Sequence, residues 1–134
     1  MKSNQENQYI KAEVTIKAKV NQTEDQTKVE NSILNMVTEK HSINIIKDNY
    51  LMLKGDLSLL LRIKNRIHKH EQEELIKYIL EKNRKDSLLK FFINKQSAFN
   101  NTFHIIDESM STLGDIEVEI ITDYPEEVIE WFSS

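Results

Sequence analysis

The sequence IKAEVTIKAKV, residues 10–20, alternates apolar and polar residues, and this alternation decides the fold class. A period of two is typical of a strand with one buried face. The apolar positions are Ile10, Ala12, Val14, Ile16, Ala18 and Val20. A second alternating run, DIEVEIIT at residues 115–122, predicts another such strand, with Ile116, Val118 and Ile120 pointing inward. The sheet is therefore expected to have one buried face and one polar face.

The residues between these two runs predict helices and further strands. Residues 24–38 change to helical spacing, with Thr23 as the expected N-cap and Gln26 completing a capping box. Residues 42–54 hold two short apolar stretches that predict a strand or a hairpin. Asp56 is expected to cap a helical stretch that continues to about residue 83, as two helices or one bent helix.

The second half of the chain predicts three strands and a final helix. After a turn at residues 83–86 we expect a strand at 88–94, a loop, a strand at 102–106, and the alternating strand beyond a turn at Gly114. Pro125 suits the first turn of a helix, where its missing N–H costs nothing. The apolar face of this helix is formed by Val128, Ile129, Trp131 and Phe132.

The element order is therefore β-α-β(β)-α-α-β-β-β-α, which predicts an α+β fold with a mixed or mainly antiparallel sheet and helices packed on one face. The 134 residues fit one domain, so we expect a disordered polar tail at 1–8 and a single domain at 9–134. No apolar run approaches the roughly 18 residues of a membrane helix. The sequence also begins with polar residues rather than a signal peptide, so we expect a soluble, cytoplasmic protein without a membrane partner.

The composition argues against most catalytic chemistries. The absence of cysteine excludes disulfides, thiolate metal sites and thiol nucleophiles, and two glycines leave no Gly-rich loop for phosphates. His70 and Glu74 could share a helix face, with Glu71 beside them, but their spacing matches no known metal motif. We therefore expect no catalytic residues, no metal and no cofactor. A deep pocket at His68, His70 and Glu74 would reopen the case for an enzyme.

The net charge of −4 is unevenly distributed along the chain. Residues 1–61 hold eight cationic and eight acidic side chains, residues 62–95 hold ten and five, and residues 96–134 hold none and nine. Within the basic stretch, Arg62, Arg66 and Lys69 recur at helical spacing and line one helix face. Such a row either follows a phosphate backbone or is an ordinary solvated face, and the sequence leaves both interpretations open.

The stretch FFINKQSAFN, residues 91–100, combines aromatic and polar residues after a predicted strand. Asn94, Lys95 and Gln96 are expected in a polar loop, with Lys95 as an exposed cation. Two interpretations remain for this loop. The three residues bind RNA beyond the basic helix, or the amides of Asn94 and Gln96 tie the strand end to the turn at Gly114.

Four short motifs in this chain resemble those of a known archaeal family. They are Thr23-Glu24-Asp25, Asn94-Lys95-Gln96 with Ala98-Phe99, Leu113-Gly114 before Ile116, and Ile129-Glu130-Trp131. The second is similar to the family's most distinctive motif, Asn-Lys-Gln-Ala-Ala-Phe. The family consists of conserved, uncharacterised proteins with a predicted RNA-binding role. Its fold is similar to that of large-subunit ribosomal protein L-five, so the resemblance implies an L-five-like fold for this chain.

The chain departs from the family pattern at four positions. Gln22 stands in place of a proline, Ser97 in place of an alanine, and Thr112 and Asp115 in place of two turn prolines. Losing prolines mainly relaxes the unfolded chain and the rigidity of turns, so the fold should survive. The family's arginine-rich second-helix segment is matched only loosely by residues 62–77.

Two hypotheses about function follow from these observations. The first is a small non-catalytic protein that binds structured RNA or a ribonucleoprotein surface. The residues expected to contact the RNA are Arg62, Arg66, Lys69, Asn94, Lys95 and Gln96. The second is a protein-interaction or self-associating module, such as a homodimer, with no nucleic-acid role; the opposed charge blocks and the sheet edges favour it.

Overall fold

A computed structural model describes residues 10–37, 44–111 and 113–134 of the chain. Its centre is a six-stranded sheet with the order β2-β3-β1-β6-β4-β5, in which neighbouring strands run antiparallel. The strands are β1 (Glu13–Lys19), β2 (Asn44–Ile46), β3 (Tyr50–Gly55), β4 (Leu88–Ile93), β5 (Ile105–Ile106) and β6 (Ile116–Ile121). The expected α+β class and the mainly antiparallel sheet are confirmed.

The two alternating runs form neighbouring strands in the middle of the sheet. Ile16 of β1 lies opposite Leu53 of β3 on one side and Val118 of β6 on the other, and all three are buried. The expected inward residues are buried in both runs: Val14, Ile16 and Ala18 in β1, and Ile116, Val118 and Ile120 in β6. The first strand is shorter than residues 10–20. Ile10, Ala12 and Val20 lie beyond the ends of β1, where they are partly buried against the core.

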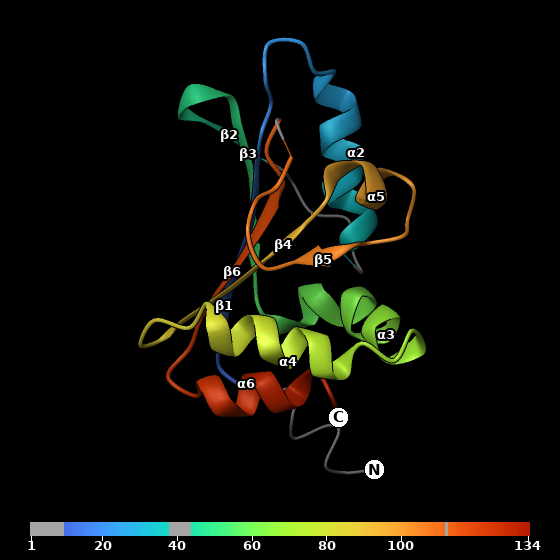
Figure 1. The fold of residues 1–134 in the computed structure, drawn as a ribbon. Coiled ribbons are helices and arrows are strands. Elements are labelled where there is room, and N and C mark those ends of the chain that lie inside the picture. Colours follow the sequence, from blue (N-terminus) through green and yellow to red (C-terminus); the bar gives the residue numbers. More distant parts are fainter. Residues whose placement is uncertain (1–9, 38–43, 112) are drawn as a thin grey trace.

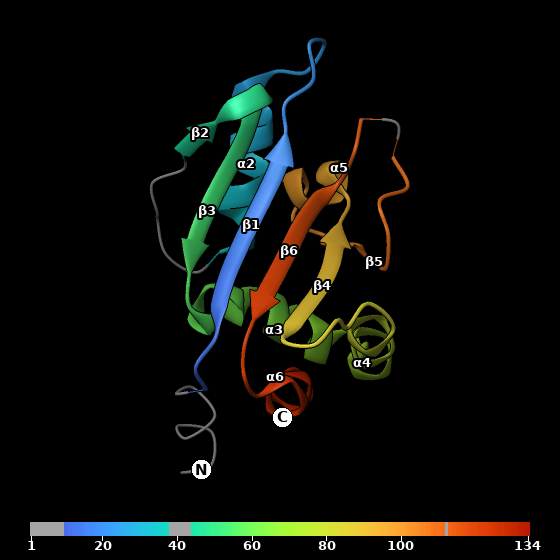
Figure 2. The same cartoon turned by 90° about the vertical axis from the view of Figure 1, so that its left-hand side faces the viewer.

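The helices cover one face of the sheet, and the other face is open (Figure 1, Figure 2). The α-helices are α2 (Gln26–Met36), α3 (Leu61–Lys69), α4 (Glu73–Lys82), α5 (Lys95–Phe99) and α6 (Pro125–Trp131); short 3-10 helices are η1 (Lys47–Asn49) and η2 (Leu57–Leu60). Pro125 begins α6 as expected, and Trp131 and Phe132 are buried. The large buried side chains Phe91, Met36 and Ile63 fill the space between sheet and helices.

The first helix begins later than the sequence pattern predicts. The expected N-cap Thr23 is wrong, because Asp25 has this role and its Oδ1 accepts a hydrogen bond from the Thr27 N–H at 2.9 Å. Gln26 does not complete a capping box; its Nε2 donates to Glu30 Oε2 one turn along the helix.

The strand or hairpin expected at residues 42–54 is a hairpin of β2 and β3. Residues 42 and 43 lie outside the described residues, as does the predicted tail at 1–8.

The loop expected after residue 94 is wrong, because this segment is the helix α5. Asn94 is its N-cap, and Asn94 Oδ1 accepts a hydrogen bond from the Ser97 N–H at 2.8 Å. The strand expected at 102–106 shortens to Ile105–Ile106. Phe103 has a φ of 51°, which interrupts the extended backbone before that point.

No helix in the described parts of the chain is both long enough and apolar enough to span a bilayer.

Candidate functional site

Lys95 lies at the centre of a polar cluster that joins three segments distant in sequence. Its Nζ is 2.9 Å from Glu24 Oε1 and donates to the backbone oxygens of Lys19 at 2.7 Å and Leu113 at 2.9 Å. Only 11% of the Lys95 side chain and 13% of the Glu24 side chain are exposed. The expectation that Lys95 is an exposed cation is therefore wrong, because its charge is used inside the fold.

Glu24 is held ionised by its neighbours in this cluster. Burial alone raises the pKa of Glu24, but hydrogen bonds from the backbone and side chain of Asn21 and from Lys95 outweigh this effect and leave the pKa below its ordinary value. The same Asn21 side chain donates to Leu113 O at 2.7 Å, so it also ties the Gly114 turn to the start of α2. Glu24 and Lys95 therefore form a fixed, charged pair near neutral pH.

The polar cluster explains why three of the sequence motifs occur together. Glu24, Lys95 and Leu113 come from three different motifs, and Lys95 contacts the other two. The segment does contact the Gly114 turn, as one of the two interpretations predicted. The contact is made by Lys95 through Leu113 O, and not by the amides of Asn94 or Gln96. Asn94 caps α5, and Gln96 is exposed.

The predicted basic row on α3 lies at the helical side of the molecule. Arg62 Nη1 donates to Asn35 O at 3.1 Å near the end of α2, and Arg66 Nη2 donates to Asn101 O at 2.6 Å beyond α5. Arg66 also lies over the Phe103 ring, 5.6 Å from its centroid. A guanidinium carries five N–H donors, so one such bond orients it and leaves other donors for a ligand. In Arg66 the Nε is buried without a hydrogen-bond partner, so only its terminal nitrogens can reach a ligand. Sequence spacing found the row but missed these contacts.

The neighbouring cations of α3 have different surroundings. Lys69 is exposed, as the pattern predicts. Lys64 Nζ donates to Ser134 O at 2.8 Å and lies over the Trp131 ring, and burial lowers the pKa of Lys64. His68 Nδ1 is 2.8 Å from Glu73 Oε2. No group of three His, Asp or Glu residues within the described segments is arranged to hold a metal ion.

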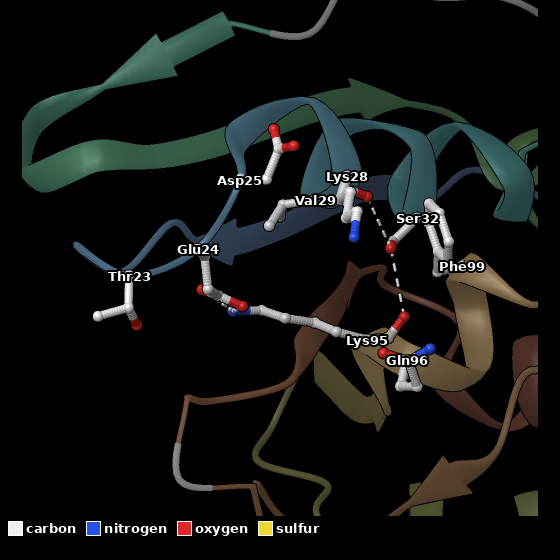
Figure 3. Close-up of a pocket in the computed structure, with 9 residues that line it drawn as sticks. All are labelled: Thr23, Glu24, Asp25, Lys28, Val29, Ser32, Lys95, Gln96 and Phe99. Atoms are coloured by element: carbon white, nitrogen blue, oxygen red, sulfur yellow. Dashed lines mark hydrogen bonds and ion pairs between the residues drawn. The ribbon is translucent and has the colours of Figure 1, made fainter.

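A pocket of about 320 Å³ lies between the first turns of α2 and the helix α5 (Figure 3). It is lined by Thr23, Glu24, Asp25, Lys28, Val29, Ser32, Lys95, Gln96 and Phe99. Lys28 Nζ lies 5.9 Å from the centroid of the Phe99 ring. Asn35 Nδ2 donates to Phe99 O at 3.2 Å, and Arg62 binds Asn35 O, so the pocket adjoins the basic row. The sequence pattern did not indicate Lys28 as a residue of the site. It indicated Phe99 only as the aromatic residue of the Asn-Lys-Gln motif.

The open face of the sheet is electrostatically different from the helical side. Glu117 on β6 lies 3.7 Å from Lys17 Nζ and 3.5 Å from Lys90 Nζ, and Lys90 also lies 3.7 Å from Glu119. Lys17 and Lys90 are thus paired with carboxylates, whereas Lys19 and Lys54 on the same face form no ion pair with the described residues. Arg62, Arg66, Lys69 and Lys28 form no ion pair with any carboxylate of the described residues. Their charge is available to an anionic partner.

Comparisons with known proteins identify the family of this chain. The family model described as RNA binding matches residues 13–122. A UPF0201 protein of Methanothermobacter thermautotrophicus is 33% identical over 120 residues, which cover 90% of this chain and 89% of that protein. A UPF0201 protein of Methanocaldococcus jannaschii is 31% identical over 119 residues, which cover 88% of this chain and 68% of that protein. The crystal structure of a UPF0201 protein from Methanococcus jannaschii superimposes with a TM-score of 0.68 and 27% identity over 90% of each chain. The chain therefore belongs to the RNA-binding family and is a relative of the archaeal UPF0201 proteins.

Proposed function

We propose that this chain is a non-catalytic protein that binds structured RNA through its helical side. The proposed surface, called here the helical face, consists of the row Arg62, Arg66 and Lys69 on α3 and the adjoining ends of α2 and α5. The observation that carries the proposal is the position of Arg62 and Arg66. They lie one helical turn apart, and each is fixed by a bond to a backbone oxygen of a neighbouring segment.

This arrangement suits phosphate binding for a physical reason. Arginine binds phosphate through several N–H donors at once, and a side chain already held in place loses less conformational entropy on binding. The family supports RNA as the partner, and the acidic partners of Lys17 and Lys90 make the open sheet face a poorer phosphate surface. Lys95 and Asn94 are left out of the proposed contacts because the fold uses both internally.

A binding experiment with matched variants tests the proposal. Binding of a labelled RNA hairpin is measured by fluorescence anisotropy for the natural protein, for Arg62→Gln with Arg66→Gln, and for Lys54→Gln with Lys77→Gln. Both double variants lose two positive charges, but Lys54 and Lys77 are exposed on β3 and α4, which are not part of the helical face as defined above. We expect a marked loss of affinity for the arginine variant only. Equal affinities of the two folded variants would contradict the proposal.

Self-association remains a second candidate because α4 exposes two apolar side chains. Leu75 is 40% exposed and Tyr78 is 58% exposed, three residues apart on the same helix. A dimer that used this surface would dissociate when Tyr78 is changed to Glu. Analytical sedimentation of the RNA-free protein at high concentration would detect the dimer. A protein that stays monomeric under these conditions would exclude self-association.

A further inference from the structure

The pocket between α2 and α5 has a shape and chemistry that phosphate binding alone does not use. We infer that it takes one unpaired nucleobase of the bound RNA. This inference rests on the proposed RNA-binding function and adds that the helical face recognises unpaired nucleotides. Unpaired bases are the part of an RNA that proteins recognise by stacking and by hydrogen bonds to the base edge.

The walls of the pocket suit a flat aromatic ring. Its volume of about 320 Å³ is at the lower end of the range for small-ligand sites. The half-buried Phe99 lies at one end, and Val29 and the extended Lys95 side chain lie along the sides (Figure 3). A base that enters this space can stack on Phe99, which is the interaction that unpaired bases most often make with proteins.

Lys28 is placed to hold the phosphate of the same nucleotide. Its Nζ lies 5.9 Å from the Phe99 ring centroid, and its side chain is exposed at the mouth of the pocket. No carboxylate of the described residues pairs with it. A cation beside an aromatic ring provides both a stacking surface and a phosphate contact for one nucleotide.

The polar groups of the pocket do not select one base. The Asp25 carboxylate caps α2 through the Thr27 N–H and points away from the space between Lys95 and Phe99 (Figure 3). The exposed Gln96 amide offers one donor and one acceptor to the edge of a base.

A direct chain of contacts connects the pocket to the arginine row. Arg62 donates to Asn35 O, and the Asn35 side chain donates to the backbone oxygens of Ala98 at 3.0 Å and Phe99 at 3.2 Å. A phosphate bound at Arg62 therefore lies beside the segment that carries Phe99. An RNA strand that follows the row can place its next unpaired base in the pocket.

The test uses two labelled RNAs with the same stem. One is a hairpin with a loop of unpaired uridines, and the other is the stem duplex without the loop. We expect the natural protein to bind the hairpin more tightly. Phe99→Leu should weaken that binding about tenfold or more, as loss of one base–aromatic stack does. The matched control Phe92→Leu changes a half-buried aromatic on the open sheet face and should leave binding unchanged.

Lys28→Gln provides a second variant that does not depend on removing a packed ring. Lys28 is exposed, so the fold should remain, but binding of the hairpin should weaken. Equal binding of both RNAs by the natural protein, or unchanged binding by Phe99→Leu, would overturn the inference. If the Arg62 and Arg66 variant still shows reduced RNA affinity in that case, only the pocket is wrong. If neither RNA binds at all, the proposed function fails with it.

Discussion

Lys95 Nζ lies 2.9 Å from Glu24 Oε1, and this pair links the start of α2 to the start of α5. Both side chains are mostly buried. Because Lys95 also binds the backbone oxygens of Lys19 and Leu113, it holds three segments of the chain together. The most distinctive motif of the sequence is therefore a structural feature, and it builds one wall of the pocket beside Phe99.

Replacing Lys95 by methionine should destabilise the protein strongly. The change leaves the Glu24 carboxylate and two backbone oxygens without their donor, and breaking a buried pair in this way costs about 3 kcal/mol. Urea-induced unfolding measures this loss. The control Lys77→Met, at an exposed position on α4, should change the free energy of unfolding by about 0.5 kcal/mol or less. Equal stability of the two variants would contradict the structural role of Lys95.

The contribution of Glu24 should depend on pH in the acid range. Its pKa in the folded protein lies below the ordinary value of 4.5, so the folded state favours the ionised form. The stabilisation is complete above that ordinary value and is lost as the pH falls through the folded pKa. We expect Glu24→Gln to be less stable than the natural protein at pH 7, with the difference shrinking on acidification. A difference in unfolding free energy that stays constant down to pH 3 would refute this.

Glu117 should behave in the opposite way. Burial and a hydrogen bond with Glu119 raise the pKa of Glu117, and the nearby Lys17 and Lys90 offset this only in part. The folded state therefore favours the protonated form, so the ionised carboxylate costs stability once the pH rises above its ordinary value. Glu117→Gln should therefore stabilise the protein at pH 7, and the gain should vanish at low pH. Thermal unfolding at both pH values measures the effect, and a clear loss of stability at pH 7 would contradict it.

Asn94 should affect stability rather than RNA binding. Its side chain caps α5, and replacing a capping asparagine by alanine costs about 1 kcal/mol. Asn94→Asp keeps an acceptor at the cap, so it should retain most of the stability that Asn94→Ala loses. Both variants should bind RNA with the affinity of the natural protein. Weaker RNA binding by a fully folded Asn94→Ala variant would instead support a direct RNA contact.

Periodicity predicted the parts of the fold that depend on local pattern. The alternation in β1 and β6 and the first turn of α6 were correct because burial of one face imposes a regular spacing of apolar residues. The position of α5 was missed. A helix of five residues carries too few apolar positions for a period, and it depends on the Asn94 cap and on contacts with α2.

The candidate site was predictable only in part for a similar reason. The spacing of Arg62, Arg66 and Lys69 is local, so the sequence contains it. The contacts of Lys95 join residues up to 76 positions apart, and no local pattern encodes them. The same applies to the pocket, where Lys28 and Phe99 come together through the packing of α2 on α5.

The salt dependence of RNA affinity tests the central claim most directly. The logarithm of the binding constant for the RNA hairpin is plotted against the logarithm of the salt concentration for the natural protein and for Arg62→Gln with Arg66→Gln. Each phosphate contact contributes a slope of roughly −0.7 to −0.9, so losing two contacts should make the slope shallower by about 1.5. The Lys54→Gln and Lys77→Gln control should keep the natural slope. Identical slopes for the natural protein and the arginine variant would contradict RNA binding through the helical face.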